Sequence, residues 1–229
     1  MGYWENTTYL HHGDADAVAR AIEQVLAAEG MLPVPAPPPR TRGVFEPMQY
    51  DVALDNDLWA IAIFPGAEGW CVVKTAPLEL LSQRAAGAQR MRLADVCIAL
   101  GASAFQVNLY DGATVLAEVS AQGEVMISGF NGQSDDPMDW HGIEVEEDRI
   151  EPAFELHDLA HLAPDGRGDS FAAATAREIG GANAAHCDNR TCVVTLICNE
   201  PLAIQGGRSI YYRWQGPSRQ KNQPRASWR

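Results

Sequence analysis

The chain has 229 residues, 46% of them hydrophobic and 21% charged, a composition typical of a globular protein rather than a disordered one. Its 30 acidic and 17 basic residues give a formal net charge of -13, which disfavours binding to nucleic acid or anionic lipid, since phosphate charge dominates both interactions. No apolar run approaches the roughly 20 residues of a membrane helix, and no signal peptide precedes His12, so we expect a cytoplasmic protein without a membrane partner.

The negative charge is concentrated in residues 1 to 200. This part holds 30 acids against 11 bases, a net of -19, because no acidic residue follows Glu200. Such a body attracts a basic protein and accelerates the encounter, although acidity also serves solubility alone. The basic residues after Glu200 are Arg208, Arg213, Arg219, Lys221, Arg225 and Arg229.

The first predicted element is an amphipathic helix over residues 14 to 29. Asp14 is a good N-cap because its carboxylate can accept a hydrogen bond from an unpaired backbone N–H group. Val18 and Ile22 then fall on one face at helical spacing. Gly30 ends the helix.

A proline-rich connector follows at residues 33–43. Its backbone should be an extended polyproline II helix, which has no internal hydrogen bonds. We interpret the connector as a stiff spacer between the first helix and the next strand. The pattern Pro35-x-x-Pro38-x-Arg40 also fits the peptides that SH3-type grooves bind, which is the alternative interpretation.

Strand-like runs come next, at residues 58–64 and 70–75, joined by a turn rich in glycine. Pro77 is favoured at a first helical position, so we expect helical structure to begin near it. The main helix of this part is predicted over residues 92–100. A strand with period-two alternation then begins at Phe105, and its polar residues, such as Gln106, lie on the face opposite the apolar ones.

The last third of the chain has the same order of elements. A helix is predicted over residues 169–179, with strands at 150–156, 192–198 and 209–214. Because the strands are joined by short turns rather than helical crossovers, we predict an α+β fold, an antiparallel sheet backed by helices on one face. Repeated helix–hairpin units would account for the shared order.

The expected organisation is a single domain over residues 1–215. An internal boundary near residues 131–149 is the alternative to one uninterrupted domain. The remaining residues, 216–229, are polar and basic, which is typical of a flexible tail.

The most unusual segment is a long loop over residues 129–142, followed by further acidic residues up to Glu151. Long ordered loops are disproportionately functional. The carboxylates lack the spacing of an EF-hand loop, so we interpret the segment as a protein-binding site, with a solvated loop as the alternative. The candidate partner-binding residues are Asp135, Asp136, Asp139, Trp140, His141, Glu146 and Glu147.

A metal site is an alternative use of His157 and His161, which lie four residues apart and would share one helical face. A zinc-peptidase signature has glutamate directly after the first histidine, whereas this chain has Asp158. No third ligand is evident, so we expect no metal cofactor.

The odd number of cysteines and the absence of a C-x-x-C pair argue against a disulfide framework. We expect reduced, mostly buried thiols. Cys187 follows His186 directly, so a thiol nucleophile activated by this histidine is the second enzymatic alternative. The five cysteines are Cys71, Cys97, Cys187, Cys192 and Cys198.

His11 and His12 lie just before the first predicted helix, where the N-terminus favours anions. They are a weaker candidate than the acidic segment, since they can simply end a strand. No complete set of catalytic residues is evident in the sequence. We therefore expect a non-catalytic, acidic binding protein whose partner is a basic protein, as for an immunity protein or antitoxin, with a small metal- or thiol-dependent hydrolase as the alternative.

Overall fold

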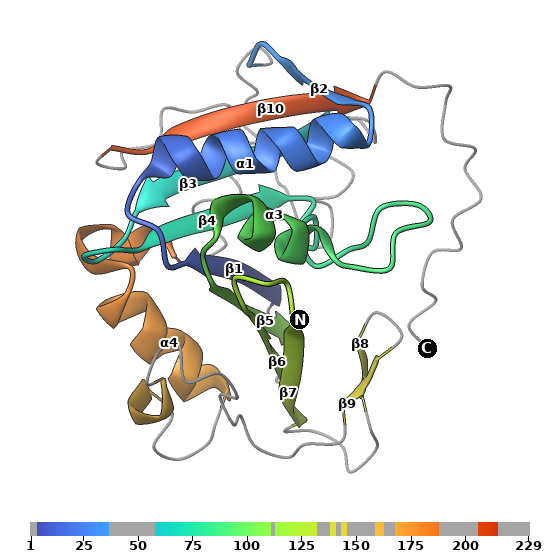
Figure 1. Ribbon diagram of the computed structural model, residues 1–229. Coiled ribbons are helices and arrows are strands. Elements are labelled where there is room, and N and C mark those ends of the chain that lie inside the picture. The colour runs from blue at the N-terminus through green and yellow to red at the C-terminus, as the bar shows by residue number, and fades with distance from the viewer. Residues whose placement is uncertain are drawn as a thin grey trace, which may run out of the picture.

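Within the described part of the chain, eight strands form one antiparallel sheet (Figure 1). The computed structural model describes residues 4–36, 58–110, 113–131, 138–140, 143–145, 159–162, 168–187 and 206–214. The predicted α+β fold with an antiparallel sheet is confirmed. Among these residues, no helix has the length and apolar character needed to cross a bilayer. In order across the sheet the strands are β2 (Met31–Val34), β10 (Arg208–Trp214), β3 (Leu58–Pro65), β4 (Cys71–Ala76), β1 (Trp4–Leu10), β5 (Ala104–Tyr110), β6 (Ala113–Val119) and β7 (Val125–Asn131).

Strand β1 joins the two halves of the sheet. It pairs with β4 on one side and with β5 on the other. On the far side of β4, β10 lies between β2 and β3. Strand β1, from the beginning of the chain, thus lies between the β3–β4 and β5–β6 hairpins. Strand β10, from the end of the described residues, lies between β2 and β3, so all these segments share one sheet.

The first helix, α1 (Ala15–Ala28), lies where the sequence predicts it. The carboxylate of Asp14 accepts hydrogen bonds of 2.8 and 3.2 Å from the backbone N–H groups two and three residues further on, which satisfies donors that the helix itself leaves unpaired. Ile22 and Leu26 are fully buried against the sheet.

Helix α3 (Arg92–Leu100) packs beside α1 on the same face. It ends at Gly101, whose φ of 62° lies in the left-handed region that glycine adopts without strain. The prediction of helical structure near Pro77 is wrong, because residues 77–90 form turns and bends. Leu80 and Leu81 are both buried, and the carbonyls of Leu81 and Gln83 accept hydrogen bonds from the backbone N–H groups of Leu93 and Arg92 instead of continuing a helix.

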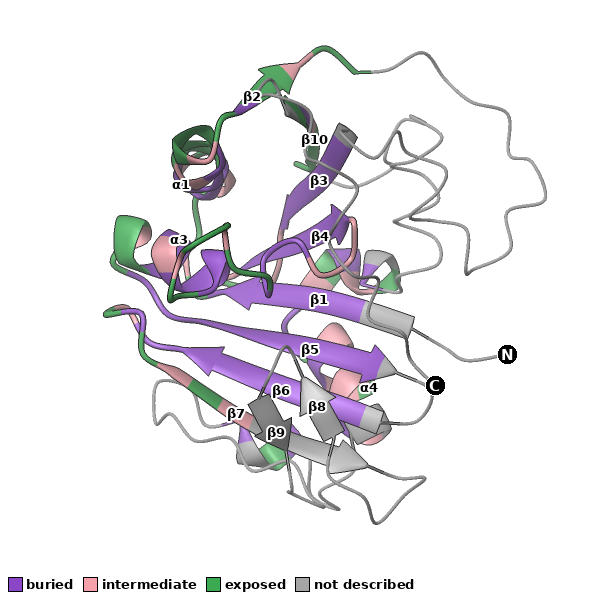
Figure 2. Cartoon of the chain, turned by 90° about the vertical axis from the view of Figure 1, so that its right-hand side faces the viewer, coloured by how far each residue is buried: buried purple, intermediate pink, exposed green. Residues whose placement is uncertain are grey.

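Helices also cover the opposite face of the sheet, so the expectation of one covered face is wrong. This second layer consists of α4 (Gly168–Glu178) and two short 3-10 helices, η2 (Ala160–Leu162) and η3 (Gly181–His186). Figure 2 shows why both layers are needed: the central strands are buried along successive positions, which point to alternate faces. Because neither face of these central strands is exposed to solvent, helices must pack against both faces.

The two faces of β1 and β5 differ in chemistry. On the α4 side lies an aromatic cluster, in which Tyr9 and Phe105 stack at 4.9 Å between ring centroids. Trp70 and Phe171 meet Phe105 edge to face at 5.6 and 6.2 Å.

On the α1 and α3 side lies an amide cluster of five buried polar residues. The Asn6 amide donates to Asn108 Oδ1 at 2.5 Å and to Ser82 Oγ at 3.3 Å. The Gln106 amide donates to Thr8 Oγ1 at 2.8 Å and its carbonyl accepts from Ser82. Ser82 belongs to the segment over residues 77–91, so this segment covers the polar part of the sheet.

Candidate functional site

The acidic segment contains a short hairpin. In the described residues, β8 (Met138–Trp140) and β9 (Ile143–Val145) form a separate two-stranded sheet, in which Asp139 pairs with Glu144 and Trp140 pairs with Ile143. Strand β9 contacts β7, the last strand of the large sheet.

These two strands were not predicted. Residues 129–142 were expected to form one loop, whereas residues 129–131 belong to β7 and residues 138–140 to β8. The signal was a short apolar–acidic–apolar alternation in each strand, too short to stand out from a loop. The other predicted partner-binding residues, Asp135, Asp136, His141, Glu146 and Glu147, lie outside the described residues.

The candidate metal ligand His161 is exposed and lies in η2. Its Nε2 is 2.9 Å from Oε1 of Glu178 on α4. His157, the second candidate ligand, lies outside the described residues. Within the part of the chain that the structure describes, no group of three or more His, Cys, Asp or Glu side chains is placed to hold a metal ion.

The candidate nucleophile Cys187 is fully buried, directly after His186 at the end of η3. Its Sγ lies 3.9 Å from the carbonyl oxygen of Asn183. Burial raises the pKa of Cys71 to about 11, with a further contribution from Asp14, and burial raises the pKa of Cys97 to about 12. A buried thiol is a poor nucleophile, because the thiolate is the reactive form.

A surface corner lies where two turns meet, and it brings His11, a candidate from the sequence, beside residues far from it in the chain. We define the corner surface as His11, Asp14, Glu68 and Trp70. The β3–β4 turn carries Glu68 and Trp70, and the turn between β1 and α1 carries His11 and Asp14. The rings of His11 and Trp70 lie 4.8 Å apart at 46°.

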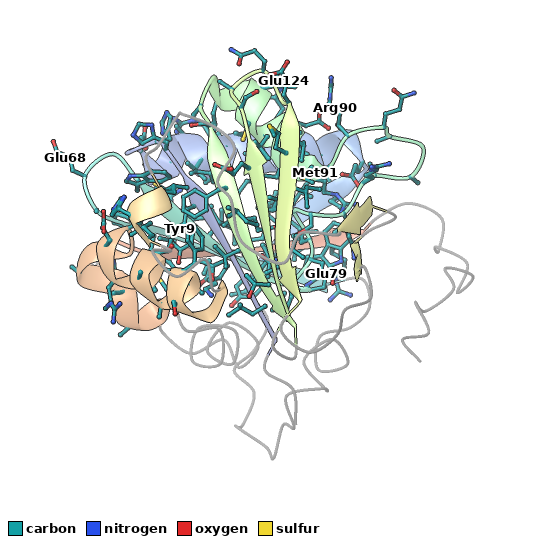
Figure 3. All side chains as sticks on the ribbon, turned by 90° about the horizontal axis from the view of Figure 1, so that it is seen from below. Tyr9, Glu68, Glu79, Arg90, Met91 and Glu124 are labelled. Carbon is teal, nitrogen blue, oxygen red and sulfur yellow. The ribbon has the colours of Figure 1, made fainter. Side chains whose placement is uncertain are left out.

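The two turns approach each other closely. A Cβ atom on Gly13 would lie 3.6 Å from Cα of Gly69, and a Cβ atom on Gly69 would lie 3.5 Å from Nε2 of His11. Gly69 also has a φ of 82°, which favours glycine. Figure 3 shows Glu68 at the outer end of the β3–β4 turn.

Comparisons with protein-family models, with curated proteins and with solved structures found no match to this chain.

The carboxylates of this corner are exposed, and two of them have an arginine nearby. Asp14 and Asp16 are more than half exposed, and Glu68 is exposed. Arg20 approaches the Asp14 carboxylate at 3.8 Å, and Arg208 forms an ion pair with Asp16.

The anion-binding role expected for the residues before α1 finds no support here. The Asp14 carboxylate already accepts the hydrogen bonds of the first helical turn and places a negative charge there. His12 Nδ1 accepts a hydrogen bond of 3.2 Å from the backbone N–H of Asp14. The start of α1 is thus already occupied by a carboxylate of the chain itself.

Proposed function

We propose that the protein is a non-catalytic binding protein whose partner is a basic protein, as for an immunity protein or an antitoxin. The observation that carries the proposal is the charge of residues 1 to 200, a net of -19. A field of this sign raises the local concentration of a basic protein and can increase its association rate by about tenfold or more.

The acidic residues around the β8–β9 hairpin are the proposed centre of binding. They are Asp135, Asp136, Asp139, Glu146 and Glu147, with Trp140 and His141 between them. Aromatic residues are enriched among those that dominate binding energy, and the surrounding carboxylates supply orientation and rate. The hairpin lies beside the sheet, since β9 contacts its last strand, β7.

The first experiment is a pull-down with the immobilised full chain from a lysate of the organism that encodes it, at low ionic strength. Captured proteins are identified by mass spectrometry, purified and measured one by one. We expect a basic protein whose association rate falls as salt is raised from ~0.05 to ~0.5 M, because salt screens exposed charges.

The second experiment locates the binding charges. Neutralising Asp139, Glu146 and Glu147 together (D139N, E146Q, E147Q) should slow association about tenfold, and adding D135N and D136N should slow it further. The matched control neutralises three exposed carboxylates elsewhere, Glu23, Glu124 and Glu178. The proposal fails if no basic protein binds at low salt, and the location fails if both triple variants bind equally.

A further inference from the structure

The loop between β4 and α3 carries two exposed arginines, Arg84 and Arg90. In Figure 1 this loop extends outward from the body of the protein, and Arg90 lies at the periphery in Figure 3. Ala86 and Gly87, between the two arginines, are exposed as well. A Cβ atom on Gly87 would meet nothing within 4 Å, so no other part of the protein packs against this position.

The loop tip, residues 84–90, is weakly held. None of these seven residues is buried. The backbone N–H of Ala88 donates to the Ala85 carbonyl at 3.0 Å. Nε of Arg90 lies 3.1 Å from the Asp95 carboxylate, but both side chains are exposed, and exposed ion pairs contribute little to stability. A segment with so little buried surface opens locally at a small cost in free energy.

The base of the loop, in contrast, is fixed to the body of the protein. The backbone N–H of Leu93 donates to the Leu81 carbonyl at 2.9 Å. The backbone N–H of Arg92 donates to the Gln83 carbonyl at 3.0 Å. Ser82 is buried within the amide cluster. All of these contacts lie outside the loop tip, so the tip can open while the base stays in place.

The other lysine and arginine residues of the described part of the chain lie in helices or strands. They are Arg20 in α1, Lys74 in β4, Arg92 in α3, Arg177 in α4, and Arg208 and Arg213 in β10. A peptide bond within such an element reaches a protease only after local unfolding. Arg90 is followed by the buried Met91. The bond after Arg84, which precedes small residues, is therefore the most accessible to an arginine-specific protease.

A chain cut after Arg84 remains joined through the sheet. The first fragment contains β1, β2, β3 and β4, and the second contains β5, β6, β7 and β10. Strand β1 pairs with β5 from Trp4 to Leu10, and β10 pairs with both β2 and β3. Strand β10 of the second fragment thus lies between two strands of the first. Helix α1 of the first fragment also packs beside α3 of the second.

We propose that the loop tip is a site of limited proteolysis by a trypsin-like protease, which converts the protein into two interlocked chains, residues 1–84 and 85–229. Such a protease selects arginine because its specificity pocket contains a carboxylate, and exposed tips of small residues are preferred sites of cleavage. Water adds across the Arg84–Ala85 peptide bond. Its oxygen joins the Arg84 carbonyl carbon to form a carboxylate, and its two protons pass to the Ala85 nitrogen, which leaves as an ammonium group. The inference is independent of the basic partner proposed above.

The first test is a brief digestion of the full chain with trypsin, in which each product is identified by mass spectrometry. The Arg84–Ala85 bond should be cut about tenfold or more faster than the bonds after Arg20 and Arg177, because opening the tip costs less than unfolding a helix. R84Q should remove this product, since glutamine carries no charge for the specificity pocket. The matched control is R20Q, which removes an exposed arginine from α1 and should leave the cut unchanged.

The second test cuts the loop alone. The recognition sequence of a highly specific protease is inserted between Ala86 and Gly87 of the full chain, and near-ultraviolet circular dichroism monitors the fold before and after the cut. The two fragments should elute together in size-exclusion chromatography and separate in urea. Because the cut protein unfolds into two chains, its urea midpoint should rise with protein concentration, whereas that of the uncut insertion variant should not.

Each part of the inference has a result that overturns it. The cleavage site is wrong if the Arg84–Ala85 bond is cut no faster than the bonds in α1 and α4, or if R20Q slows the cut as much as R84Q does. The two-chain form is wrong if the fragments separate without urea or if the cut protein loses its folded spectrum. An uncut insertion variant that does not fold would contradict the independence of the tip from the body.

Discussion

The aromatic cluster and the amide cluster lie back to back on the same two strands. On β5, Phe105 points to the α4 side, and Gln106, the next residue, points to the α1 and α3 side. Both residues are almost fully buried. The aromatic side is stabilised by the burial of apolar surface. This interaction has no preferred direction, so it tolerates small shifts of the side chains. The amide side depends on directional hydrogen bonds, and each bond lost leaves a partner unsatisfied in the interior.

The largest effect is expected on the aromatic side. Replacing Phe105 by alanine should lower the free energy of unfolding by about 3–5 kcal/mol, because it removes a buried ring and leaves a cavity between Tyr9, Trp70 and Phe171. Urea unfolding followed by circular dichroism measures the change. Met126→Ala is the control, since Met126 is 48% exposed and its loss should cost less than about 0.5 kcal/mol. Equal losses in the two variants would contradict the importance of the cluster.

A smaller loss is expected on the amide side. Gln106→Leu keeps a similar volume but removes the donor to Thr8 and the acceptor for Ser82. It should lower the free energy of unfolding by about 1–3 kcal/mol. Gln122→Ala, at an exposed position in the β6–β7 turn, is the control.

The coupling within the amide cluster provides a stricter test. The double variant of Gln106→Leu and Ser82→Ala should cost less than the sum of the single changes, by about 0.5 kcal/mol or more, because both remove the same hydrogen bond. Additive losses would show that the two side chains are not coupled. A Gln106→Leu protein as stable as the original would show that the cluster fills space without stabilising the fold.

The difference between the aromatic and amide clusters also shows how far the sequence predicts the fold. Apolar periodicity and helix ends are local signals, so the helices over residues 14–29, 92–100 and 169–179 were predicted close to their observed bounds. The position of β10 between β2 and β3 depends on contacts between distant segments, for which no local pattern exists. Alternation placed Gln106 opposite Phe105, but it could not distinguish a solvated polar face from one covered by residues 77–91.

The candidate sites show the same limit. The acidic segment could be found from composition alone, because charge is visible in the sequence. Trp70 was missed, since its neighbour His11 precedes it by 59 positions in the chain and nothing local connects the two. The available signal was the pair of glycines that flank the β3–β4 turn, Gly66 and Gly69, which permit close approach by neighbouring segments.

The smallest expected effect of a single substitution is a gain, on the same side as the amide cluster. Tyr212 is 1% exposed, and within the described residues its hydroxyl has no hydrogen-bond partner. Tyr212→Phe removes this unsatisfied group and should raise the free energy of unfolding by about 1 kcal/mol at neutral pH. Thermal and urea unfolding of the two proteins measure the difference.

The pH dependence of that gain identifies its cause. Burial, with a contribution from Glu23, raises the pKa of Tyr212 from 10.0 to about 12. The native hydroxyl therefore keeps its proton between pH 10 and about 12, whereas the unfolded one loses it, so the original protein loses stability as pH rises through this window. Phenylalanine cannot ionise, and the advantage of Tyr212→Phe should grow from pH 9 to pH 11. A loss of stability at neutral pH would mean that the Tyr212 hydroxyl is satisfied and stabilises the fold, as the amide cluster on the same side does. An advantage independent of pH would mean that burial does not raise the pKa of Tyr212.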